Sequence, residues 1–185
     1  MMKGRTEKRL RPSFIRASGL TLVEVLVTVA VYSVVIAGAY SVLTSGILTW
    51  QVNNVKVELQ QDLRKAMDWM MLDLRQAGVS SIDDVPVSNS WSTVITFSIA
   101  NGVSGGVTTW TSDKIKYYLS GTGNTQLKRQ YGAAIRDIAQ DITVFQVRRP
   151  VSAPNTVEVN LQAQKQTIQG NTVQLNQSFV VKLRN

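Results

Sequence analysis

The chain has 185 residues, enough for one domain of ordinary size with an appendage but not for two large domains. It contains no cysteine and no histidine, which excludes disulfides, thiolate nucleophiles, Cys/His zinc sites and histidine-dependent catalytic pairs. The formal net charge is +8, of which residues 1–19 carry +5, so the rest of the chain is only weakly basic. No paired-carboxylate or phosphate-loop motif is present, and we do not expect an enzyme or a bound cofactor.

Residues 1–19 form a basic leader, and residues 20–50 form an almost continuous apolar run. No charged residue occurs from Val25 to Val55, whereas about 20 apolar residues suffice to cross a bilayer as a helix. Basic residues directly before such a run are expected on the cytoplasmic side of the membrane. The pattern therefore predicts a single transmembrane helix with a cytoplasmic N-terminus.

A cleaved secretory signal is the competing interpretation of this segment. Ala37, Gly38 and Ala39 offer a small-residue cleavage site. The apolar run continues well beyond that site, however, and Glu24 lies inside it. A carboxylate in a membrane is costly and should have a partner, so we favour a segment that is retained.

Residues 51–78 are polar in composition but continue the helical period. Their apolar residues recur at steps of three and four, which places one stripe along the helix and predicts packing against the rest of the protein. The stripe consists of Leu59, Leu63, Met67, Met70 and Leu74. Gly78 is expected to end the helix as a left-handed cap.

Residues 79–185 change to a period of two, typical of short strands, and predict a β-rich globular head. A hairpin is expected at residues 121–124, and a short helix at residues 133–142. The expected strands are residues 92–99, 114–119, 126–130, 143–148, 156–163 and 178–184. Together with the long helix, they predict an α+β fold in which an antiparallel sheet packs on the helix stripe.

The register of the last hairpin follows from its apolar residues. A two-residue loop would leave the apolar sets of the two strands on opposite faces. A three-residue loop at residues 169–171 instead pairs Leu161 with Phe179 and Val159 with Val181. We therefore expect the three-residue loop.

The segment Gly19-Leu20-Thr21-Leu22-Val23-Glu24 resembles the cleavage and methylation motif of the type IV pilin and type II secretion pseudopilin family. The resemblance implies that a prepilin peptidase cuts between Gly19 and Leu20 and N-methylates Leu20. It also implies that Glu24 pairs with the new amine of Leu20 on a neighbouring subunit during assembly. Phenylalanine is commoner in the family where Leu20 stands.

A weaker resemblance covers more of the chain. The segments "MLDLRQAGV", "IKYYLSGTGNTQLKRQ", "DITVFQVR" and "VVKLRN" are similar to W-type minor pilins and J-type minor pseudopilins. In these families an aspartate-arginine pair ends the long helix, and a tyrosine-bearing strand leads to a Leu-x-Arg strand. Major pilins often carry a helix proline, where Ser41 lies here, and a C-terminal cysteine pair, which this chain lacks.

The resemblance implies a pilin-like fold and a minor subunit that initiates or caps a type IV pilus. Its partners would be prepilin peptidase, minor and major pilins, the inner-membrane assembly platform and membrane lipid. The precursor would cross the inner membrane once, with its head in the periplasm, before joining a pilus or pseudopilus. A pseudopilin of type II secretion and a membrane-anchored binding domain that never polymerises remain alternatives.

Nucleic-acid capture is a further alternative, because six basic residues lie on the predicted strands and loops. The charge of +3 outside the leader argues against it, and nucleic acid is not an expected partner. The residues concerned are Lys114, Lys116, Lys128, Arg129, Arg148 and Arg149.

Overall fold

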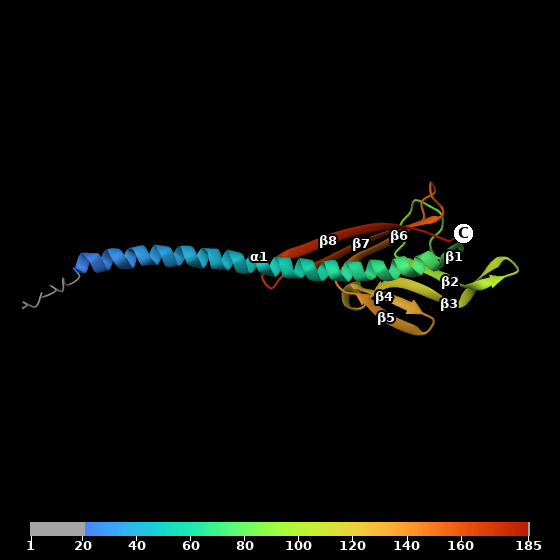
Figure 1. Ribbon diagram of the computed structural model, residues 1–185, viewed down its shortest axis with the longest axis horizontal. Helices are drawn as coiled ribbons and strands as arrows, with labels where there is room; N and C mark the ends of the chain where they lie inside the picture. Colours follow the sequence, from blue (N-terminus) through green and yellow to red (C-terminus); the bar gives the residue numbers. More distant parts are fainter. Residues whose placement is uncertain (1–20, 185) are drawn as a thin grey trace, which may run out of the picture. The chain divides into compact units, whose positions relative to one another are not determined.

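The computed structural model describes residues 21–184. They begin with one continuous helix, α1 (Leu22–Gln76), coloured blue to green in Figure 1. The chain divides into two compact units between Gly46 and Ile47. The described part of the first unit is helix alone, and nearly all of its side chains are exposed although most are apolar.

The helix α1 ends where the chain enters a strand, without the glycine cap expected from the sequence. Gly78 belongs to β1 (Ala77–Ile82) and does not have a positive φ. Glycine is needed at this position for packing, because a Cβ here would lie 2.1 Å from the Trp110 ring. The expected left-handed cap is therefore wrong, and Gly78 provides close packing instead.

The second unit contains two antiparallel sheets beside α1, rather than the one sheet expected (Figure 1). The first sheet has the order β1-β2-β3-β4-β5, and consecutive strands pair as neighbours. Beyond β1, its strands are β2 (Val94–Ser104), β3 (Val107–Ser120), β4 (Gln126–Tyr131) and β5 (Ala134–Ala139). The short 3-10 helix η1 (Thr122–Asn124) joins β3 to β4 at the predicted hairpin.

The second sheet has the order β6-β7-β8. Its strands are β6 (Ile142–Arg148), β7 (Thr156–Gln166) and β8 (Thr172–Lys182). Buried residues alternate along β7 and along β6 from Phe145 onward, as the period of two predicted, whereas the register of β6 shifts between Ile142 and Val144.

Residues 133–142 do not form the expected helix. They contain β5, which pairs with β4 through a two-residue turn of Gly132 and Ala133, with Gly132 at φ 55°. The isoleucines at 135, 138 and 142 have helical spacing, but an isolated helix of this length is only marginally stable. Pairing with β4 provides the backbone hydrogen bonds of this segment instead.

The last hairpin has a longer loop than expected. Val159 pairs with Phe179 and Val157 with Val181, so the predicted register is wrong by two residues. The apolar sets still share a face, because a shift of two preserves the alternation. The five-residue loop from Thr167 to Asn171 is closed by hydrogen bonds between those two residues.

The core confirms the predicted stripe of α1. Leu59, Leu63, Met70 and Leu74 are fully buried or nearly so, and Met67 is partly buried against the same core. They pack in one cluster with buried side chains of both sheets, including Phe97, Tyr117, Phe145 and Leu161. The observed fold is thus a long N-terminal helix packed on antiparallel sheets, an α+β pilin-like fold.

Candidate functional site

The N-terminal turn of α1 is held by two residues of the predicted motif. The Thr21 backbone N–H donates to Oε2 of Glu24 at 2.9 Å, and the Thr21 hydroxyl donates to the same oxygen at 3.0 Å. The backbone N–H of Glu24 donates in return to the Thr21 hydroxyl oxygen at 3.3 Å. This reciprocal arrangement is a capping box, in which Thr21 is the N-cap and Glu24 the third helical residue.

The sequence carried this signal in plain form, as Thr followed three residues later by Glu before an apolar run. The prediction for Glu24 covered only an intersubunit partner and did not include this local role. The predicted cleavage residues, Gly19 and Leu20, lie outside the described residues. Among the described residues, Oε1 of Glu24 has no hydrogen-bond donor, so this oxygen can accept from another chain.

An apolar surface follows directly after Glu24. Valine, leucine, isoleucine and tyrosine side chains of α1 up to Tyr40 are 47% to 79% exposed. Within the described residues, α1 is the one helix long and apolar enough to cross a membrane. Such a surface can be covered by lipid or by other apolar helices.

A buried charged group lies at the other end of α1, within the second unit. Asp73 accepts hydrogen bonds from Nε of Arg129 at 2.6 Å and from Nη2 at 3.1 Å. The Tyr117 hydroxyl donates to Asp73 at 2.5 Å. The Arg129 guanidinium also lies 5.4 Å from the ring centre of Trp69, over its π-system. The cluster thus fixes the end of α1 to β3 and β4.

The environment keeps these donors protonated. Burial, followed by the neighbouring Asp73 carboxylate, raises the pKa of the Tyr117 hydroxyl above its ordinary value. Hydrogen bonding to Asp73 raises the pKa of Arg129. The cluster joins the Asp, Tyr and Leu-x-Arg motifs noted in the sequence, although Asp73 pairs with Arg129 rather than with Arg75. Its atoms are buried and mutually satisfied, which suits a structural role.

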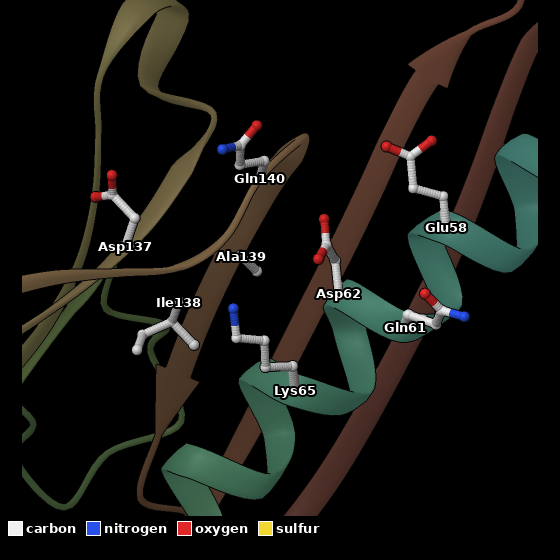
Figure 2. A pocket seen from close by; sticks show the side chains of 8 residues that line it. All are labelled: Glu58, Gln61, Asp62, Lys65, Asp137, Ile138, Ala139 and Gln140. Carbon is white, nitrogen blue, oxygen red and sulfur yellow. The ribbon is translucent and has the colours of Figure 1, made fainter.

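A polar pocket of about 270 Å³ lies between α1 and β5 (Figure 2). Figure 2 shows Asp62 and Lys65 projecting from α1, with Asp137 across the pocket. Asp137 is paired with Lys128 at 3.0 Å, and Glu58, which also lines the pocket, is paired with Lys165 at 2.5 Å. Two of the three carboxylates that line the pocket are therefore already paired with lysines.

The six basic residues weighed for nucleic-acid binding are mostly engaged. Four of them form ion pairs with carboxylates, and Arg149 is buried with its guanidinium donating to the Pro154 carbonyl oxygen. The four pairs are Lys114–Asp83, Lys128–Asp137, Arg129–Asp73 and Arg148–Glu158. Of these six residues, Lys116 alone has neither an ion pair nor a hydrogen bond among the described residues, and its ammonium lies 5.4 Å from the ring centre of Tyr118.

Comparison with protein families finds a match at the N-terminus. Residues 15–40 match the family model of the prokaryotic N-terminal methylation motif. The match covers the predicted cleavage residues, the capping box and the first part of the exposed apolar surface. No curated protein matches the chain.

Proposed function

We propose that this chain, whose N-terminal methylation motif and fold support the type IV pilin and pseudopilin family, is a minor subunit of a type IV pilus. The family's members are structural subunits, and the motif implies processing by prepilin peptidase and assembly with other pilins. The apolar N-terminal helix fits a membrane-anchored pilin. The finer proposal concerns cleavage, assembly and the place of the subunit in the filament.

Cleavage would fall between Gly19 and Leu20 and remove the basic leader of residues 1–19. Residues 20–50 would then anchor the protein in the inner membrane, residues 51–76 continue the helix, and the strands that begin at Ala77 would belong to the periplasmic head. The capping box supports this processing site, because α1 begins at Leu22, two residues after the proposed cut. The new N-terminus would therefore lie directly before a preformed helix.

The observation that carries the proposal is the hydrogen bonding of Glu24. Its Oε2 serves the capping box, while Oε1 has no donor among the described residues. In a filament, Oε1 would accept from the methylated amine of Leu20 on a neighbouring subunit. That amine exists only after cleavage, so the pairing would couple processing to assembly. A charge-assisted hydrogen bond away from water is strong enough to select the inserted subunit.

The role of a low-abundance initiating or capping subunit is supported by the head. A buried Asp–Arg–Tyr cluster unites motifs that resemble those of W-type and J-type minor subunits. A pseudopilin of type II secretion shares these features and is the alternative from the same class. A non-polymerising membrane-anchored domain is the second alternative, and the methylation motif opposes it, since such a domain needs no prepilin processing.

Deletion of the gene in its own organism tests the role. A minor pilin that initiates assembly predicts far fewer surface pili per cell, with secretion of folded proteins unchanged. Expression of the full chain should restore pilus number. The reverse result, normal piliation with defective secretion, would assign the chain to a pseudopilus. No change in either process would contradict both assignments.

A further inference from the structure

The loop between β7 and β8 has an inverted pattern of exposure. Thr167 is 6% exposed, whereas the following Ile168 is 93% exposed, the largest value among the exposed large apolar residues described. In water the opposite arrangement is expected, with isoleucine buried and threonine outside. The loop therefore presents an apolar side chain that the fold itself does not use.

The loop is built to hold this side chain outward. The Thr167 N–H donates to the Asn171 carbonyl at 2.8 Å, and the Asn171 N–H donates to the Thr167 hydroxyl at 3.1 Å. The Gly170 N–H donates to the Thr167 carbonyl at 2.9 Å, and Gly170 adopts φ 83°, which favours glycine. Ile168 is thus at the tip of an ordered turn.

The loop lies beside α1 where the apolar run ends. Residues of the loop and of α1 line a shallow groove of about 230 Å³. On the helix side, Trp50 is 65% exposed, and the Gln51 Oε1 is buried without a hydrogen-bond partner among the described residues. The groove therefore combines two exposed apolar side chains with an unsatisfied acceptor.

The position of Trp50 along α1 matches the thickness of a bilayer. From Leu22 to Trp50 the helix rises about 42 Å at about 1.5 Å per residue. A bilayer with its headgroup regions is about 40–45 Å thick, and tryptophan is enriched at its interfaces. If the helix enters the membrane near Glu24, Trp50 lies at the outer headgroup layer, with the groove and Ile168 beside it.

We propose that the loop Thr167–Asn171 and Trp50 form a membrane-docking surface, in which Ile168 inserts into the outer headgroup region of the bilayer that holds α1. This inference rests on the membrane anchoring in the proposed function and adds a second contact to it. The occupant is phospholipid because the groove contains Trp50, which follows Leu22 by a helix rise close to the thickness of a bilayer and is of a residue type enriched at bilayer interfaces. The docked loop holds the head in contact with the bilayer surface before the subunit enters a filament.

Single-cysteine labelling tests this surface cleanly, because the natural chain has no cysteine. Full-length Ile168→Cys is labelled with an environment-sensitive fluorophore and reconstituted into vesicles of phosphatidylethanolamine and phosphatidylglycerol. Val107→Cys, on the β2–β3 hairpin and 69% exposed, is the matched control for the affinity of the fluorophore itself for lipid. Quenching by a headgroup spin-labelled lipid and by aqueous iodide is compared, after flotation confirms that both variants are membrane-bound.

The proposal predicts several-fold stronger quenching by spin-labelled lipid at position 168 than at 107, with protection of position 168 from iodide. Equal lipid quenching at the two positions, or free access of iodide to position 168, would overturn the docking surface while leaving membrane anchoring intact. Protection from both quenchers would mean that another protein copy covers the loop, and would also overturn it. Failure of either variant to float with vesicles would contradict the anchoring itself, and the docking with it.

Discussion

Asp73, near the end of α1, holds Arg129 of β4 by two hydrogen bonds, Nε–Oδ2 at 2.6 Å and Nη2–Oδ1 at 3.1 Å. The side chains are only 10% and 14% exposed, so each charge depends on the other for its solvation. The pair connects the helix to the sheet across 56 positions of sequence.

Replacement of Asp73 by asparagine should strongly destabilise the head. Asp73→Asn keeps the shape but leaves the Arg129 guanidinium without its counter-charge, which costs about 3 kcal/mol in the free energy of unfolding. Denaturant titration of the full chain in detergent measures the loss. Asp83→Asn is the matched control, because its ion pair with Lys114 is about half exposed and should contribute less than about 1 kcal/mol. Equal losses in the two variants would contradict the role given to Asp73.

Tyr117 should make stability fall at high pH. Its pKa is raised in the folded state, so above the ordinary value of 10.0 the unfolded chain releases the proton while the native chain retains it. The free energy of unfolding then declines with rising pH by up to about 1.4 kcal/mol per pH unit from this one group. Below pH 10 the contribution is constant.

Tyr117→Phe tests the alkaline effect, since phenylalanine has no proton to release. The variant should lose about 1 kcal/mol at neutral pH with the missing hydrogen bond, yet decline less steeply than the natural chain between pH 10 and 11.5. The contribution of lysine titration is the same in both chains, so it cancels in the difference between their profiles of unfolding free energy against pH. Parallel profiles would show that Tyr117 ionises equally easily in both states.

Gly78→Ala should destabilise the head by overpacking. The new Cβ would lie 2.1 Å from the Trp110 ring, which must move, at a cost of about 1–3 kcal/mol. Gly102→Ala, in β2, is the control, because the nearest atom to its Cβ is 3.4 Å away. Trp110→Leu should relieve the effect of Gly78→Ala in the double variant. Losses that simply add would mean that the ring is not the obstacle.

Glu24→Ala should separate processing from assembly. Cleavage should remain nearly intact, while incorporation into sheared filaments falls about tenfold or more, because one charge-assisted hydrogen bond is lost. Quantitative immunoblotting of the filament fraction measures this. Thr21→Val removes the hydroxyl of the capping box but retains the carboxylate, and should have a smaller effect. Normal incorporation of Glu24→Ala would contradict the pairing of Glu24 with a neighbouring amine.

The long helix and six of the strands could be predicted because their apolar residues repeat with a clear period. β1 was missed, since residues 77–82 are short and have no strong alternation. β5 was mistaken for a helix because Ile135 and Ile138 have helical spacing, while its pairing with β4 depends on the turn at Gly132. The local sequence pattern thus predicted the strands that bury one face. It did not predict the strands whose formation depends on pairing with a neighbouring strand.

Some contacts of the candidate site could be predicted from the sequence, and others could not. Glu24 stood out as a charge in an apolar run, and its capping partner Thr21 could have been read from the spacing. The partner of Asp73 could not, because Arg75 is nearer in sequence and only the packing of β4 against α1 selects Arg129. The exposure of Ile168 likewise depends on a loop whose length was predicted wrongly.

Processing of the chain as a pilin precursor would leave a defined N-terminal peptide, which mass spectrometry can identify. The protein is extracted from membranes of its own organism and digested, without first enriching either the precursor or the processed chain. We expect a mature chain that begins at Leu20 with an N-methylated amine. An intact leader, or a chain that begins at Tyr40 after signal-peptide cleavage, would contradict it.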